Sequence, residues 1–183
     1  MRSKRLPVVE VNTIFFAVTA LSIFIGNPMS IVLGLSNGSR WMNYLLILID
    51  QLIFVLLPVV LYLNYKAKTV DIRKVLRLNP IKPAVTMLVI LIAVCTNYII
   101  GFLDILTVYL LGFIGEVPSF PLNPAPDAFH LAASLVIASL VPSICEEILH
   151  RGIIMNSYEI RGSMKAVVVS AMFFGIFHYD IRN

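Results

Sequence analysis

Long apolar runs separated by short polar stretches form the hydrophobic pattern of this chain. The runs cover residues 13–35, 41–65, 84–114, 129–159 and 164–179. Because a helix needs about 20 residues to cross the hydrocarbon core of a bilayer, the pattern predicts about five membrane-spanning segments. The predicted fold is therefore an all-α, polytopic transmembrane helical bundle, and residues 1–183 are expected to form a single membrane-embedded domain.

The composition indicates a membrane protein and argues against several other classes. Of the 183 residues, 59% are hydrophobic and 13% are charged, and the mean hydropathy of +0.91 lies outside the range of soluble globular domains. Both cysteines, Cys95 and Cys145, fall inside apolar runs, which argues against a disulfide framework. The net charge of +4 comes from connectors beside the apolar runs, so the sequence predicts the lipid bilayer, and no nucleic acid, as a partner.

The connectors alternate in charge. Basic residues gather at the N-terminus and in the 66–82 connector, the 36–40 loop is nearly neutral, and the 115–127 connector is acidic. By the positive-inside rule we expect a multi-pass integral protein of the plasma membrane with its N-terminus in the cytoplasm. Within the basic connector, apolar and charged positions interleave over residues 71–78. This pattern fits either a short helix in the membrane interface or a solvated loop.

A cluster of polar residues lies inside the fourth apolar run, at Glu146, Glu147, His150 and Arg151. A charged side chain in the middle of a membrane-spanning helix costs roughly 3 kcal/mol, so such residues face a bundle interior or a wet cavity and mark a site. Glu147 and Arg151 are four residues apart on one helix face, where an ion pair is expected. Glu146 lies about 100° further round the helix and is left free of that pair.

The fifth run brings an imidazole to the same depth. Gly162 marks a turn that is short enough to make the fourth and fifth runs an antiparallel hairpin. Glu146 lies sixteen residues before Gly162 and His178 lies sixteen residues after it. At 1.5 Å per residue, both are roughly 24 Å along their helices, so Glu146 and His178 are expected to meet across the hairpin.

Two carboxylates and a neutral imidazole around a trapped water can activate that water against a peptide carbonyl. Adjacent carboxylates in a low-dielectric pocket resist ionising together, which favours one of them as a general base. Pro142 cannot donate a backbone hydrogen bond, so the helix is expected to bend just before the acids and to admit water. The same groups fit a divalent metal that lowers the pKa of bound water. The sequence leaves both mechanisms open.

At these residues the chain resembles the CPBP intramembrane protease family, also called the CAAX-protease, bacteriocin-processing or Abi family. The first family motif matches Glu146-Glu147-x-x-x-Arg151 and the second matches Phe174-x-x-x-His178. The resemblance implies an endopeptidase that cleaves a peptide or protein substrate in or next to the membrane. Glu146 would activate water, Glu147 would be its partner held by Arg151, and His178 would bind water or metal. It leaves open whether zinc, another divalent metal held by Glu147 and His178, or no metal takes part.

The family has a third motif on a later helix, a histidine followed four residues on by asparagine or a similar residue. The given chain ends five residues after His178, so the domain is expected to be C-terminally incomplete, either as a truncated copy or as a degenerate member. Loss of oxyanion donors typically costs about a hundredfold in rate, which puts the activity of these 183 residues in question.

Other functions are compatible with an intramembrane charged pocket. One is a non-catalytic immunity or scaffold protein that uses the pocket only for binding. Another is a proton-coupled carrier, although no inverted repeat is present. Glu147 and His150 also form a Glu-x-x-His pair, as in di-iron bundles. Such a centre needs a second copy, and Asp127-x-x-His130, the nearest match, lies in the wrong place.

Overall fold

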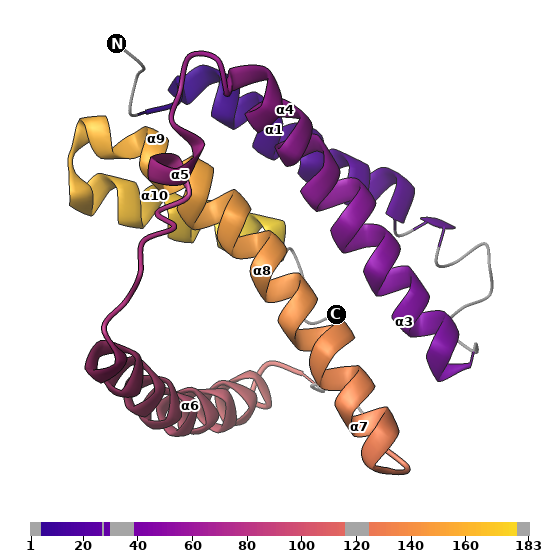
Figure 1. Cartoon of the computed structure of the whole chain (residues 1–183). Coiled ribbons are helices and arrows are strands. Elements are labelled where there is room, and N and C mark those ends of the chain that lie inside the picture. The colour runs from indigo at the N-terminus through magenta and orange to yellow at the C-terminus, as the bar shows by residue number, and fades with distance from the viewer. Residues whose placement is uncertain (1–4, 27, 30–38, 116–124, 179–183) are drawn as a thin grey trace. The chain divides into compact units, whose positions relative to one another are not determined.

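The computed structural model describes residues 5–26, 28–29, 39–115 and 125–178, and its regular elements are helices (Figure 1). This confirms the predicted all-α fold. The chain divides into two units, of which the first contains residues 1–78 and 124–179 and the second contains residues 79–123 and 180–183.

Within the described residues, four helices are long and apolar enough to cross a membrane, namely Val8–Gly26, Arg40–Lys66, Pro83–Leu111 and Ala128–Arg161. The first combines α1 (Val8–Leu21) with the π-helix η1 (Ser22–Gly26), and the second combines α3 (Arg40–Ile49), η3 (Asp50–Leu56) and α4 (Leu57–Lys66). The fourth is built from α7 (Ala128–Ser134), η4 (Leu135–Leu140), α8 (Val141–Glu147), η5 (Ile148–Met155), α9 (Asn156–Tyr158) and η6 (Glu159–Arg161). The fifth predicted segment is α10 (Ser163–Phe177), whose 15 residues extend only about 22 Å.

Two of the π-helical stretches come directly before a proline. Pro142 has no N–H for the carbonyl of Ala138, and over η4 the helix widens so that the Val141 N–H bonds the Val136 carbonyl. The η3 stretch ends in the same way before Pro58. Where the sequence predicted a bend just before the acids, the structure thus has a π-helical stretch. Gly26-Asn27-Pro28 predicts a kink or a re-entrant turn in the first run; η1 ends at Gly26, and Asn27 lies outside the described residues.

The core of the first unit forms where α1, the second span and the fourth span meet. Its fully buried side chains include Phe15, Val18, Val55, Leu149 and Ile153. Hydrogen bonds tie the ends of these helices together. The Ser157 hydroxyl donates to the Leu6 carbonyl at 3.0 Å, and the Tyr158 hydroxyl donates to Asn12 Oδ1 at 2.9 Å.

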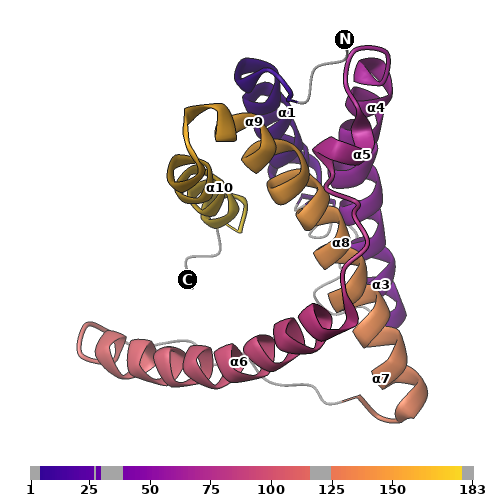
Figure 2. The same ribbon diagram turned by 60° about the vertical axis from the view of Figure 1, so that its left-hand side comes forward.

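After Gly162, α10 turns back and packs along η5 (Figures 1 and 2). Gly162 has φ +107°, a backbone conformation that favours glycine, so the residue type permits the sharp reversal. At the opposite end of the fourth span, Asp127 caps α7 by accepting the His130 backbone N–H at 2.8 Å. This hydrogen bond lowers the pKa of the Asp127 carboxyl group.

The basic connector contains the short helix α5 (Ile72–Val75), and it packs against the protein core. Val75 is fully buried, and Leu76 lies over Gly152 of η5, where an added Cβ would be 2.7 Å from Leu76 Cδ2. Arg77 adopts a positive φ of 54° and pairs with Glu159. The short helix, one of the two predicted alternatives, is therefore present, with Val75 buried by protein and Leu78 exposed.

The second unit contains the 29-residue helix α6 (Pro83–Leu111). Apolar side chains lie on all sides of α6, and none of its residues is buried within the described structure. A helix that is hydrophobic all round is suited to a membrane span.

Candidate active site

The helix hairpin brings together the two groups that were predicted to meet. His178, at the end of α10, places Nε2 3.5 Å from Glu146 Oε2 on α8. The Glu146 side chain is only 14% exposed, while that of His178 is about half exposed. Glu146 and His178 therefore lie at the same depth in the hairpin, as predicted, although they are 32 residues apart in the sequence (178 minus 146).

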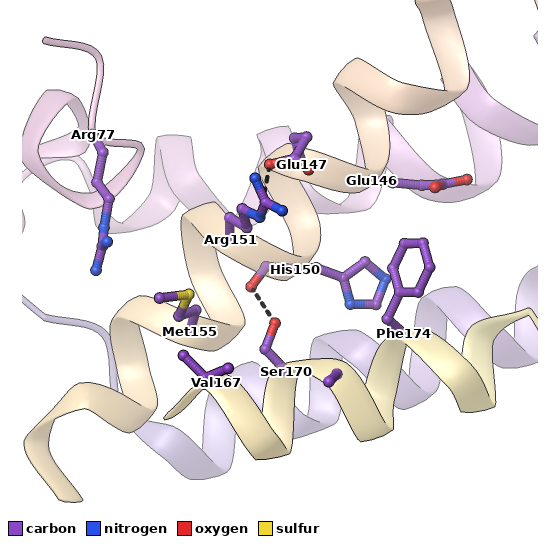
Figure 3. A pocket seen from close by; sticks show the side chains of 10 residues that line it. Arg77, Glu146, Glu147, His150, Arg151, Met155, Val167, Ser170 and Phe174 are labelled. Atoms are coloured by element: carbon purple, nitrogen blue, oxygen red, sulfur yellow. Dashed lines mark hydrogen bonds and ion pairs between the residues drawn. The ribbon is translucent and has the colours of Figure 1, made fainter. Parts of the chain in front are cut away.

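The neighbouring carboxylate has a different partner. Glu147 Oε2 lies 3.3 Å from Arg151 Nε, which is the predicted ion pair one helical turn apart. Both side chains are well exposed, at 54% for Glu147 and 72% for Arg151. Figure 3 shows the Glu146 carboxylate pointing away from this pair. The two adjacent acids thus separate into one that faces an imidazole and one that faces a guanidinium.

A cavity of about 620 Å³ lies beside the acids. Its polar lining comes from Arg77, Glu146, Glu147, His150, Arg151 and Ser170, and Phe174 contributes to the apolar wall (Figure 3). The volume is ample for several water molecules or for a short peptide segment. Glu146 both lines this cavity and contacts His178, so it connects the two parts of the site.

The positions of the possible metal ligands test the alternative mechanism in which a divalent metal activates the water. In the part of the chain that the structure describes, no three His, Cys, Asp or Glu side chains converge in a way that could hold a metal ion. The pair named for a metal was Glu147 and His178, but His178 contacts Glu146 while Glu147 turns to Arg151. The described side chains therefore do not fit a metal site built on Glu147 and His178.

Asp50 is a third acid near the site that the sequence analysis did not assign. It begins η3, which packs against α8, and its charge is close enough to Glu146 for the two to interact. Gly26 gives the Asp50 carboxylate its room, because a Cβ there would be 2.8 Å from Asp50 Oδ1. The sequence shows Asp50 as an acid in the middle of an apolar run, but it does not show which helix packs against this acid.

Ser170 was missed as a member of the site, and His150 was included in the predicted polar cluster without a role in the chemistry. The His150 side chain is buried and lines the cavity. The Ser170 hydroxyl of α10 donates to the His150 backbone carbonyl at 3.1 Å, which pins the hairpin beside the acids (Figure 3). Phe174 of the second motif packs its ring against both His150 and His178.

These observations define a class of protein: a helical integral membrane protein with a carboxylate–imidazole site inside its membrane-spanning region. Comparison with protein families identifies the group. The model described as "Type II CAAX prenyl endopeptidase Rce1-like" matches residues 128–182, a segment that holds Glu146, Glu147, Arg151 and His178. This match confirms the predicted family resemblance over residues 128–182, and it supports a membrane endopeptidase at the level of the family. Searches of the curated proteins and of the solved structures found no match.

Proposed function

We propose that this protein is an intramembrane endopeptidase that hydrolyses a peptide bond in or next to the bilayer. The observation that supports this function most directly is the contact between Glu146 and His178 across the hairpin. A second support is that both residues lie within the segment matched by the family of CAAX prenyl endopeptidases. For this reason we propose a prenylated CAAX peptide as the class of substrate.

In the proposed reaction, Glu146 acts as a general base. Its carboxylate takes a proton from a water molecule, and the resulting hydroxide oxygen bonds to the carbon of the scissile carbonyl. When the tetrahedral intermediate collapses, the C–N bond breaks and the protonated Glu146 returns the proton to the leaving amine. The products are a new carboxyl group and a new amino group, and the enzyme is regenerated.

The neighbouring residues orient this chemistry. His178 lies within reach of the Glu146 carboxylate, so the two groups can hold an attacking water beside them. Both acids line the cavity, but Glu147 is paired with Arg151, so Glu146 is the acid that contacts the imidazole. The roles of these four residues agree with those that the family resemblance implies.

The proposal is tested by substituting Glu146→Gln, which keeps the shape of the side chain and removes its basicity. Cleavage of a fluorogenic, farnesylated CAAX peptide by the purified protein in lipid nanodiscs should fall by about a hundredfold or more, since a general base typically contributes that much. Glu10→Gln is the matched control, because Glu10 pairs with Lys66 and does not line the cavity. Undiminished cleavage by the Glu146→Gln protein would show that Glu146 is not the general base.

A further inference from the structure

His150 is a buried imidazole whose ring has no hydrogen-bond partner in the described structure. The residue is only 4% exposed, and neither Nδ1 nor Nε2 meets a partner among the described residues. A neutral imidazole carries one N–H donor and one acceptor nitrogen. Because buried polar atoms in proteins are almost always hydrogen-bonded, both ring nitrogens need a partner from elsewhere.

The surroundings of the ring indicate where that partner must come from. The rings of Phe15, Phe174 and Phe177 pack edge-on against His150, with centroid distances of 6.0, 5.1 and 5.7 Å. Benzene rings offer no conventional acceptor or donor for these nitrogens. His150 and Glu146 line the same cavity, which also has other polar side chains in its wall. Each ring nitrogen exposes less than 1 Å² in this structure, so a partner in the cavity requires the ring to turn toward that space.

The backbone holds His150 in place for such a contact. Its carbonyl accepts the Ser170 hydroxyl at 3.1 Å, which ties η5 to α10 at this residue. Phe174 and Phe177 each contact both imidazoles, because their ring centroids lie 4.4 and 5.8 Å from the ring of His178. The His150 and His178 rings thus border the same pair of aromatic side chains, and Glu146 contacts one imidazole while lining the cavity with the other.

We propose that His150 hydrogen-bonds an oxygen atom in the cavity, either the scissile carbonyl oxygen of the peptide or the water that Glu146 activates. This inference deepens the proposed function and rests on it for the identity of the oxygen. A neutral ring N–H directed at a carbonyl oxygen would stabilise the negative charge that develops there when the hydroxide adds. A ring that binds the water would instead help to hold the nucleophile in line.

Paired substitutions separate hydrogen bonding from packing. His150→Phe keeps the aromatic contacts and removes both nitrogens, and we expect it to lower kcat/KM for the farnesylated CAAX peptide by about a hundredfold, the typical effect of losing one such donor. His150→Gln, which keeps a donor and an acceptor, should recover at least a tenth of the wild-type value. His130→Phe is the matched control, because His130 pairs with Asp127 and does not line the cavity. Unchanged activity in folded His150→Phe protein would overturn the inference and leave Glu146 untouched.

Peptide binding distinguishes the two oxygen atoms. The Glu146→Gln protein should bind the fluorescent peptide without cleaving it, so its affinity can be measured by anisotropy. If His150 contacts the carbonyl oxygen, adding His150→Phe will weaken this affinity. If His150 contacts the water, the affinity will stay the same while turnover in the otherwise wild-type protein still falls. Either result supports the proposal, and it fails if neither affinity nor turnover changes.

A measurement without catalysis covers the case in which His150→Phe does not fold or the peptide is not a substrate. Wild-type protein labelled with ¹⁵N-histidine in micelles gives ring N–H signals, and the His150 signal is assigned by its loss in His150→Gln. We expect this proton to exchange quickly with water, because a ring that bonds an oxygen in the cavity turns its N–H toward that space. A slowly exchanging proton would show that the ring is dry and only packs, and this would overturn the proposal whatever the fate of the protease function.

Discussion

At the scale of single residues, consecutive positions in one helix place two identical acids in different surroundings. Neighbouring side chains on a helix point about 100° apart, so Glu146 and Glu147 cannot share a partner easily. Glu146 is largely buried against His178, whereas Glu147 is exposed and meets Arg151. The separation of roles between two equal side chains therefore follows from helix geometry alone.

The role of Arg151 can be tested apart from stability. An exposed ion pair contributes only about 0.2–1 kcal/mol, so Arg151→Ala should change the free energy of unfolding little. We expect kcat/KM to fall about tenfold nevertheless, because Glu147 loses the cation that holds it away from Glu146. Arg151→Lys, which keeps the charge without the planar fork, should recover part of the activity. Thermal unfolding and peptide cleavage would be measured side by side, and unchanged cleavage in both variants would reduce the pair to a surface contact.

The sequence could predict these pairs but not the whole site. The spacing of four residues predicted Glu147 with Arg151, and equal distances from Gly162 predicted Glu146 with His178. Asp50 escaped because an acid inside an apolar run does not reveal which helix packs against it, and here the contact is between η3 and α8. His150 belonged to the predicted cluster, but the burial of its ring among Phe15, Phe174 and Phe177 depends on tertiary packing that the spacing of residues does not encode.

At the scale of elements, the eight-residue π-helix η5 is the unusual feature of the site. π-helical geometry is rare and often occurs at functional sites. The Ser170 hydroxyl donates to the His150 carbonyl of η5 from the neighbouring helix α10. One hydrogen bond between helices therefore stabilises the local geometry and fixes the position of a cavity residue.

Ser170→Ala tests this link, and Ser157→Ala provides a matched control. Each substitution removes one buried hydroxyl hydrogen bond to a backbone carbonyl, to that of His150 or to that of Leu6. Each should lower the free energy of unfolding by about 1 kcal/mol. Only Ser170→Ala should also lower kcat/KM several-fold, because only Ser170 lies beside the cavity. Equal activity losses in the two variants would show that stability alone explains the effect.

Hydropathy located the long helices, although the first was predicted to begin at residue 13 and begins at Val8. The runs predicted at 41–65 and 84–114 correspond to helices at Arg40–Lys66 and Pro83–Leu111. Hydropathy locates such spans because lipid surrounds them and every backbone group must bond within the helix. It could not assign α5, whose Val75 is buried by tertiary packing that no local pattern encodes. It did locate the short run at 164–179, which corresponds to α10 (Ser163–Phe177).

At the scale of the whole molecule, the charge of the connectors decides which side of the membrane each end of the site faces. Lys66, Lys68, Arg73, Lys74, Arg77 and Lys82 belong to the connector that precedes α6. The chain that follows α6 carries acids and prolines. If α6 crosses the bilayer, the positive-inside rule places the first connector in the cytoplasm and the second on the other side. The side of the cavity that Arg77 lines would then face the cytoplasm.

Single cysteines test this topology. In a Cys95→Ala, Cys145→Ala background, we expect Lys68→Cys to react with a membrane-impermeant maleimide only after the cells are permeabilised. Ala125→Cys, on the far side of α6 in the chain, should react in intact cells. The physical reason is that translocating the basic connector against the membrane potential is unfavourable, at about 2.3 kcal/mol per charge for each 100 mV. Labelling of Lys68→Cys in intact cells, with Ala125→Cys protected, would invert the orientation and place the mouth of the cavity on the outer face of the membrane.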